Sequence, residues 1–576
     1  MPHARPSFFR HPGTIAALVA LALYAPTLWG TFVYDDLFQC TKDPRLADPG
    51  RWGEYFTEAY FPGGPDRLWR PLVSLSYAAQ YQLHGAVAWP FHLVNVVLHA
   101  GASALVAVLA MRIAGTGLRI EPAGPAGWWA GVVAGVLFAA HPVHVEGVAY
   151  IVGRADSACA LGTLGAVVLA TGRWTPGRAA AIVACVAVAV FSKEQGLLAP
   201  AMVAGVWALK RTGVARAAVA AAAVDAAPPD VAAAPVHALA YAPAGRPAPS
   251  REQRVARWLA VVLVFAMAAY VLYRERTFRW TFDAESLDVM IQPLAAARGA
   301  DRWLIPVAVL GRAAQLMVAP VRLSPEYGHA VITPVQSWAD PYLWAGFATL
   351  IVGVGGLVVA RRRRAWGVVF LVACAGATYG VVSNVTLIGT VFGERLLYLP
   401  SAFLIALVGV PFETCLWGAR IRGGASDRAR TLCPGLFGSA VTGSVRGRIA
   451  LAAFAIVVVL FSVRTVTYAV RWNDRLTFYE QSWADQPRAI RLAVLVAEER
   501  IGRGDVAGGR RAVEGGLALA PDYWKLWTLA MWAAIEDGDW PEAERRREGA
   551  WKRNAFPPEM LWMEKRMDER KREVGR

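Results

Sequence analysis

Two adjacent aspartates, Asp35 and Asp36, follow the first long apolar stretch of the chain. Two neighbouring carboxylates repel one another and are costly to dehydrate. Such a pair can hold a divalent cation such as Mg²⁺ or Mn²⁺, or one carboxylate can act as a general base. An acidic loop with no further role is the structural alternative. The pair therefore predicts a catalytic base or a metal site, with both residues as candidates for each role.

A second polar group lies in the segment 141–156, which reads HPVHVEGVAYIVGRAD at the end of an apolar stretch. At about 100° per helical residue, Glu146 points away from His141 and His144, which disfavours a zinc triad on one regular helix. We predict instead that these three side chains bind a phosphate or a sugar, with Arg154 as a planar donor. Interfacial capping by histidine and arginine is the structural alternative.

Two further motifs interrupt apolar sequence. Lys193 and Glu194 lie in SKEQG, and Arg395 lies in GERLLYLPS at the start of another apolar run. An arginine at this boundary could bind a lipid phosphate through two parallel hydrogen bonds. The alternatives are a self-neutralising Lys–Glu pair and an arginine that only reaches ordinary headgroups. We predict that all three residues bind a phosphate-bearing donor.

The elements that position these residues are predicted to be membrane helices. Hydrophobic residues make up 56% of the 576, charged residues only 18%, and the mean hydropathy is +0.37. This composition excludes a disordered chain, a disulfide scaffold or a simple soluble enzyme. The six cysteines form no CxxC pair and support no metal cluster. About eleven apolar segments predict an all-α, polytopic fold. They are 13–33, 90–111, 127–140, 156–170, 179–192, 196–209, 258–273, 342–360, 366–388, 396–418 and 448–468.

The topology follows from basic residues, since 59 Lys and Arg outnumber 43 Asp and Glu. With the N-terminus in the cytoplasm, every inner connection carries Arg or Lys, as the positive-inside rule requires. The inner side includes an Ala- and Pro-rich insertion at 210–257, and 302–320 is predicted to be a re-entrant or interfacial helix on the outer side. The polar segments then share the outer side. They are the first outer loop 34–89, 141–155, 193–195, 275–341, 389–395 and the tail.

The tail from 471 to 576 has the signature of a helical repeat. Gly504-Asp505 and Gly538-Asp539 lie 34 residues apart, as do Pro487 and Pro521. This is the period of the tetratricopeptide repeat, which has two antiparallel helices per unit. Two units are fewer than the three usually needed for independent stability, so we expect the tail to pack on a membrane domain spanning 1–470.

In these motifs the sequence resembles the transmembrane, tetratricopeptide-repeat-containing O-mannosyltransferases, which have the GT-C glycosyltransferase fold. The resemblance covers nearly the whole chain, but this chain has fewer repeats than the family and carries the insertion at 218–250. The matching strings, in chain order, are FVYDD, WRPLVSLSYAAQYQLHG, FHLVNVVLHA, HPVHVEGVAYIVGRAD, FSKEQGL, APVRLSPEY and GERLLYLPS.

The resemblance implies an integral-membrane transferase that moves a sugar, mannose by analogy, from a polyprenyl-phosphate donor to a hydroxyl such as that of a protein Ser or Thr. It implies that Asp35 or Asp36 is the base or a metal ligand, and that the transfer inverts the anomeric configuration. We expect a bacterial inner membrane with the site and the repeats on the periplasmic side, and no nucleic-acid partner.

A transporter or flippase of lipid-linked sugars is the main alternative. It would use similar boundary residues, but a transporter should show duplicated spans and polar groups near the membrane midplane. The sequence shows neither feature. An interaction protein with a membrane anchor is less favoured, because an anchor needs only one span.

Overall fold

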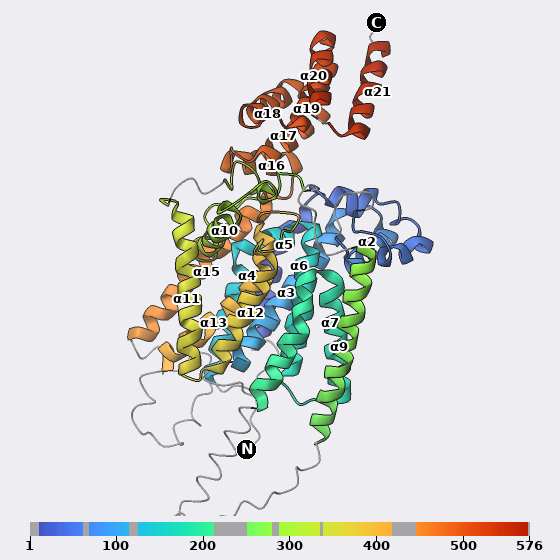
Figure 1. The fold of residues 1–576 in the computed structure, drawn as a ribbon. Coiled ribbons are helices and arrows are strands. Elements are labelled where there is room, and N and C mark those ends of the chain that lie inside the picture. Colours follow the sequence, from blue (N-terminus) through green and yellow to red (C-terminus); the bar gives the residue numbers. More distant parts are fainter. Residues whose placement is uncertain are drawn as a thin grey trace, which may run out of the picture.

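The structure is a computed structural model, and its described part of the chain comprises eight ranges. They are 11–61, 68–113, 125–211, 250–278, 287–333, 338–417, 445–553 and 555–573. None of these residues forms a strand, and helices dominate (Figure 1), which confirms the all-α, polytopic prediction. The predicted insertion at 210–257 falls mostly on 212–249, outside the described residues.

Each of the eleven apolar segments predicted to span the membrane falls on a helix. The helices are α1 Pro12–Tyr24 (continued by η2 Ala25–Trp29), α3 Ala88–Ile113, α4 Pro125–Ala140, α6 Arg154–Ala170, α7 Pro176–Ser192, a helix over 199–211, α9 Arg251–Phe278, α11 Pro341–Arg362, α12 Trp366–Val382, α13 Tyr398–Trp417 and α15 Val445–Arg471.

Fewer of these helices are both long enough and apolar enough to cross a membrane as one continuous helix. In the described residues six are long and apolar enough, and a seventh span results if the bent pair of α4 and α5 (Val145–Ala149) counts as one. The difference from the predicted eleven comes largely from short helices, such as α7 and α12, which have 17 residues each. A span of this length needs flanking residues to cross about 30 Å of hydrocarbon.

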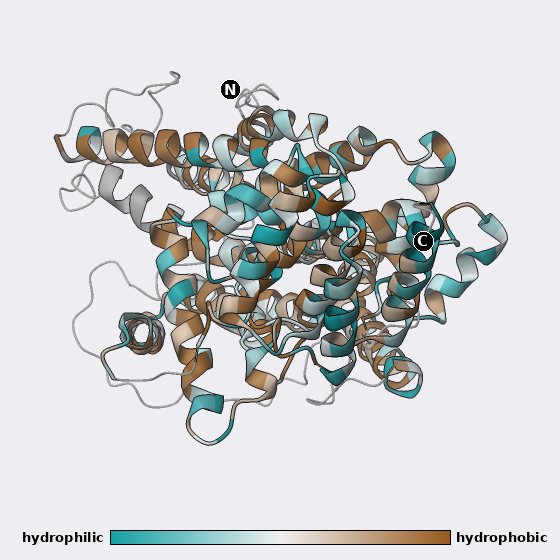
Figure 2. Ribbon diagram, turned by 90° about the horizontal axis from the view of Figure 1, so that it is seen from above, coloured by the Kyte–Doolittle hydropathy of each residue, from teal (hydrophilic) through white to brown (hydrophobic). Residues whose placement is uncertain are grey.

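The bundle has a buried centre and an apolar outside. Helices α3, α4 and α6 pack on one another or on α13, and most of their residues are buried. Helices α9, α11 and α15 leave large aliphatic side chains exposed, as expected for surfaces that face lipid. In Figure 2 brown residues cover the bundle helices, whereas teal is frequent near the C-terminus.

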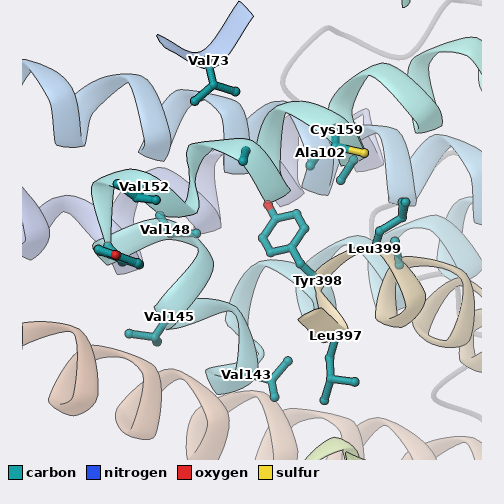
Figure 3. Close-up of a cluster of buried hydrophobic side chains, with 14 of the residues drawn as sticks. Val73, Ala102, Val143, Val145, Val148, Val152, Cys159, Leu397, Tyr398 and Leu399 are labelled. Atoms are coloured by element: carbon teal, nitrogen blue, oxygen red, sulfur yellow. The ribbon is translucent and has the colours of Figure 1, made fainter. Parts of the chain in front are cut away.

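A break between α4 and α5 shapes the centre of the bundle. The two helices meet at an angle of 52°, and the chain passes through His141 and Pro142 between them. Figure 3 shows Val145 and Val148 of the following turn, with Tyr398 and Leu397 of the neighbouring segment, in one cluster of buried side chains. The break lets the chain turn within the bundle while its apolar residues stay packed.

Helix α10 (Asp301–Val318) corresponds to the predicted interfacial segment 302–320. It packs tightly on α11, and a Cβ at Gly311 would lie only 1.9 Å from the Tyr342 carbonyl oxygen. A Cβ at Gly346 would likewise lie 2.0 Å from the Val307 carbonyl oxygen. In Figure 1, α10 lies at the end of the bundle nearest the C-terminal helices.

Six C-terminal helices lie at one end of the bundle (Figure 1); each of the first four packs on the next, and the sixth packs on the fourth. Gly504 and Gly538 lie just after the ends of two of them and have positive φ angles of 87° and 72°. The following Asp505 and Asp539 each cap the next helix. The 34-residue sequence period is therefore also a structural one, although the domain boundary at 470/471 stays a prediction. The helices are α16 Arg475–Asp485, α17 Ile490–Gly502, α18 Val506–Leu519, α19 Trp524–Asp537, α20 Trp540–Lys552 and α21 Pro557–Glu573.

Candidate functional site

A cavity of about 710 Å³ opens where the bundle meets the C-terminal helices. All of the polar segments predicted to share one side contribute to its wall. Much of the apolar wall comes from the end of α12 and the following loop and from η7 (Glu194–Leu198), and Phe61, Leu68 and Trp472 add to it. Its charged residues are Asp35, Arg70, Glu146, Asp156, Lys193, Glu194, Arg274, Glu326, Arg395 and Arg491.

Four of the five cavity carboxylates have a basic partner. Their shortest nitrogen–oxygen distances are 2.5 Å for Lys193–Asp156, 2.6 Å for Arg395–Glu146, 3.2 Å for Arg491–Glu326 and 3.3 Å for Arg274–Glu194. The cavity is thus charged but largely neutralised in pairs. Breaking such a buried pair is costly, so a cation that binds an anionic ligand here should keep its carboxylate partner.

Asp35 is the exception among the described residues that line the cavity, since it forms no ion pair. Its carboxylate accepts a hydrogen bond from the Tyr150 hydroxyl at 2.8 Å, and its own amide donates to the same hydroxyl at 3.3 Å. The side chain is only partly buried. A partly exposed carboxylate on the cavity wall that is oriented by a hydroxyl can reach the proton of a bound acceptor.

Asp36 points the other way, although it is the adjacent residue. It is fully buried, does not line the cavity, and accepts hydrogen bonds from the backbone amides of Val33, Ile151 and Val152. Burial raises the pKa of Asp36 well above its usual range, and the three amides oppose this shift. Asp36 therefore ties the loop that follows α1 to the segment 150–152.

The aspartate pair does not fit a divalent cation. Both oxygens of Asp36 are occupied by backbone amides, so the two carboxylates cannot chelate one ion together. In the described part of the chain no three His, Cys, Asp or Glu residues are grouped as metal ligands. Since Mg²⁺ prefers several oxygen ligands in octahedral geometry, Asp35 alone supplies too few side-chain ligands for such an ion.

The two predicted phosphate-binding histidines lie inside the protein and not on the cavity wall. His144 Nδ1 lies 2.8 Å from the Phe138 carbonyl oxygen, and its Nε2 lies 2.8 Å from Ser401 Oγ. His141 Nε2 lies 3.1 Å from the Met317 carbonyl oxygen, while its Nδ1 accepts from the Val143 amide. Each of the four ring nitrogens thus has a hydrogen-bond partner within the protein. Both histidines stabilise the break between α4 and α5.

Arg154 is also enclosed, with only 2% of its surface exposed. Its guanidinium donates to Asn95 Oδ1 at 3.0 Å, to Ser76 Oγ at 2.8 Å and to the Phe91 carbonyl at 3.0 Å. It also lies over the Tyr77 ring. Arg154 therefore joins α2 (Pro71–His84), α3 and α6, and it does not line the cavity where a phosphate would bind.

Lys193, Glu194 and Arg395 do line the cavity, as their predicted role requires. Glu194 lies between Arg274 and Arg70, and although burial opposes its charge, the two arginines lower its pKa. Glu146 holds Arg395 at two points, the backbone amide at 2.9 Å and Nη1 at 2.6 Å. Burial opposes the charge of Arg395, but Glu146 raises its pKa above the ordinary value.

Sequence reasoning missed several residues of the site. Arg70 and Glu326 lie in strings that carry the family resemblance, WRPLVSLSYAAQYQLHG and APVRLSPEY, but their chemistry gives no separate signal. Tyr150 lies within the segment 141–156 and could have been considered as a partner for an acid. Arg274 and Arg491 lie in helices near other arginines, and only the three-dimensional structure shows that these two line the cavity.

Comparison with known proteins finds relatives in the same family that the motifs resemble. A protein named Protein O-mannosyl-transferase Tmtc2 from Drosophila melanogaster is 40% identical over 146 residues, which cover 24% of this chain and 14% of the relative. The human protein of that name is 33% identical over 152 residues, covering 26% and 17%. Protein O-mannosyl-transferase TMTC1 from Mus musculus is 36% identical over 164 residues, covering 27% and 16%.

The matches thus cover less than a fifth of each of these relatives. No family model matches the chain, and no solved structure matches it either. Over about a quarter of its length, the chain is similar to protein O-mannosyl-transferases, which confirms the resemblance seen in its motifs.

Proposed function

We propose that this chain is an integral-membrane glycosyltransferase of the GT-C type. It takes a sugar, mannose by similarity to the named relatives, from a polyprenyl-phosphate donor and transfers it to a Ser or Thr hydroxyl of a protein. The cavity lies at the end of a bundle of apolar helices, where an amphipathic donor can keep its chain in lipid and its phosphate at the boundary. Asp35 is the proposed base.

The state of Asp35 carries this proposal. Of the carboxylates on the cavity wall, the other four are paired with a lysine or an arginine. A paired carboxylate is a poor base because the neighbouring cation favours its ionised form. Asp35 forms no such ion pair among the described residues, and the hydrogen bond from the Tyr150 hydroxyl fixes the orientation of its carboxylate.

The proposed reaction is a single displacement. Asp35 takes the proton of the acceptor hydroxyl, whose oxygen forms a bond to the anomeric carbon as the bond from that carbon to the phosphate oxygen breaks. Attack from the face opposite the leaving group inverts the anomeric configuration. The leaving polyprenyl phosphate takes the electron pair, and the proton stays on Asp35 until solvent removes it.

The cationic side chains of the cavity suit the leaving phosphate. Arg70 and Arg274 share Glu194, and Arg395 is held by Glu146, so each guanidinium is pre-positioned at the wall. Preorganised charge of this kind stabilises negative charge that grows in the transition state. Arg395 is the cation we assign to the phosphate, since its planar group can donate to two phosphate oxygens.

The proposal is tested by Asp35→Asn in purified, nanodisc-reconstituted protein with radiolabelled polyprenyl-phosphate mannose and a Ser/Thr-rich acceptor peptide. Loss of a positioned base lowers rates about 10²- to 10⁴-fold, so kcat should fall by at least about a hundredfold while the thermal midpoint stays near that of wild type. Asp48→Asn is the matched control, because Asp48 lies in the same loop but is exposed and does not line the cavity.

Wild-type turnover in Asp35→Asn would remove Asp35 as the base. The transporter alternative makes a different prediction, namely movement of the lipid-linked sugar across the bilayer with no transfer to an acceptor. A wild-type protein that moves the donor between leaflets but labels no acceptor would replace the proposed function with this alternative.

A further inference from the structure

The C-terminal helices contact the loop that carries Asp35. Tyr479 on α16 accepts a hydrogen bond through its hydroxyl from the backbone amide of Tyr34, at 3.1 Å. The rings of Tyr34 and Tyr479 also meet edge to face, with centroids 5.1 Å apart. The residues lie 445 positions apart in the chain, so this contact exists only when the C-terminal helices are docked.

The Tyr34 backbone has a conformation that needs such support. Its φ angle is 49°, which lies in the left-handed region of backbone conformations that residues other than glycine rarely adopt. Residues in this region persist only where their surroundings hold them. Because Tyr34 immediately precedes Asp35, any relaxation of its backbone rotates the peptide that leads to the Asp35 side chain.

A second residue of the C-terminal helices holds the same tyrosine. Arg491 at the start of α17 lines the cavity, its guanidinium lies over the Tyr34 ring with 5.7 Å between Cζ and the ring centroid, and its Nη1 lies 3.2 Å from Glu326 Oε1. Tyr34 is thus enclosed by the bundle on one side, through the Tyr150 ring, and by α16 and α17 on the other.

We infer that Tyr479 and Arg491 are positioning residues for the base, so that the C-terminal helices complete the active site. Tyr479 fixes the Tyr34 backbone, Arg491 fixes its ring against Glu326, and together with Tyr150 they determine where the Asp35 carboxylate points. This inference rests on the proposed function for its catalytic part. Its structural part, the hold on the loop, does not depend on any activity.

The test uses full-length Tyr479→Phe in nanodiscs with two readouts. Hydrogen exchange should become faster in the peptide that contains Tyr34 and stay unchanged in α2, because the lost hydrogen bond protects that amide. With the mannosyl donor, kcat should fall about threefold to tenfold, the equivalent of one hydrogen bond, while the donor KM changes less than about twofold. A role limited to overall folding would lower the amount of folded protein and not kcat per folded molecule.

Tyr523→Phe is the matched control, because the Tyr523 hydroxyl also joins a C-terminal helix to an outer loop, at Asp288 Oδ2, but does not contact Tyr34. It should leave kcat and the exchange of the Tyr34 peptide unchanged. Arg491→Met should lower kcat more than Arg491→Lys, because lysine keeps the ion pair to Glu326. If Tyr479→Phe does not fold, the two Arg491 variants test the positioning role in its place.

Unchanged exchange at Tyr34 in both Tyr479→Phe and Arg491→Met would overturn the inference. Faster exchange with unchanged kcat would overturn the positioning role, since the loop would then be held without any effect on the base. If wild-type protein transfers no sugar, the proposed function fails by itself, and the exchange measurement alone decides whether α16 and α17 hold the loop.

Discussion

The segment 141–156 and the segment 386–396 are both rich in motif residues, yet the structure uses them differently. In the first, His141, His144 and Arg154 face the protein interior and bond to backbone or side chains of other helices. In the second, nearly every residue lines the cavity, and Arg395 projects from it. The first segment contributes a smaller share of its residues to the wall, including Glu146 and Tyr150.

The difference shows what a polar residue in apolar sequence can mean. Within a membrane every backbone carbonyl and amide must find a partner inside the protein, so an irregular segment recruits polar side chains for its own hydrogen bonds. His141, His144 and Arg154 satisfy partners inside the protein in this way, whereas Glu146, Tyr150 and Asp156 of the same segment line the cavity. A side chain becomes available to a ligand where the loop carrying it forms a wall, as 386–396 does.

The largest effect we expect from this comparison is on folding, for Arg154→Lys. Lysine keeps the charge but cannot reach Asn95, Ser76 and the Phe91 carbonyl at once, so buried acceptors lose their donors. The free energy of unfolding should fall by about 2–4 kcal/mol. Thermal unfolding in detergent measures this, and the donor KM of the remaining folded protein should match wild type. A raised donor KM with full stability would instead place Arg154 on the phosphate.

The same substitution at Arg395 should have the opposite profile. Arg395→Lys keeps a charge beside Glu146 but loses the planar fork, so the apparent donor KM should rise about tenfold while stability changes little. Donor titrations in nanodiscs, with thermal midpoints measured in parallel, separate the two arginines. An Arg395→Lys enzyme with wild-type donor dependence would show that Arg395 only reaches ordinary headgroups.

The smallest effect concerns the pH dependence of stability. Arg70 and Arg274 lower the pKa of Glu194 below its ordinary value of 4.5, so its stabilising contribution is present above that value and is lost as the pH falls through the lower, folded-state value. Between about pH 6 and about pH 3.5, the thermal midpoint of Glu194→Gln should therefore fall less than that of wild type, by about 2 °C. Parallel curves for the two proteins would contradict the shift.

Much of the fold can be predicted from the sequence. The bilayer determines how long an apolar segment must be and which loops carry basic residues, whatever the contacts between helices. The eleven predicted segments, the separate helix predicted at 302–320 and the 34-residue repeat all correspond to helices or turns. The number of full-length spans was not predictable in this way. Helices such as α7 are short, and α4 breaks at His141, a bend that depends on partners from distant helices.

The site was predictable in part. Asp35, Glu146, Lys193, Glu194 and Arg395 line the cavity as their motifs suggested, whereas Asp36, His141, His144 and Arg154 do not. Sequence adjacency could not separate Asp35 from Asp36, because only the left-handed turn at Tyr34 and the amides of 151–152 send the two carboxylates apart. The role of Arg491 could not be predicted, since nothing in the sequence of α17 indicates that this side chain reaches the cavity.

The break after α4 also constrains the order in which the chain assembles. Three consecutive carbonyls at the end of α4 are capped from three places: Phe138 by His144 just beyond the break, Ala139 by His99 of α3, and Ala140 by the Thr465 hydroxyl of α15. The last cap arrives only after α15 has been synthesised and docked. Two of the three caps are thus available early, and the Ala140 carbonyl gains its partner only once α15 is in place.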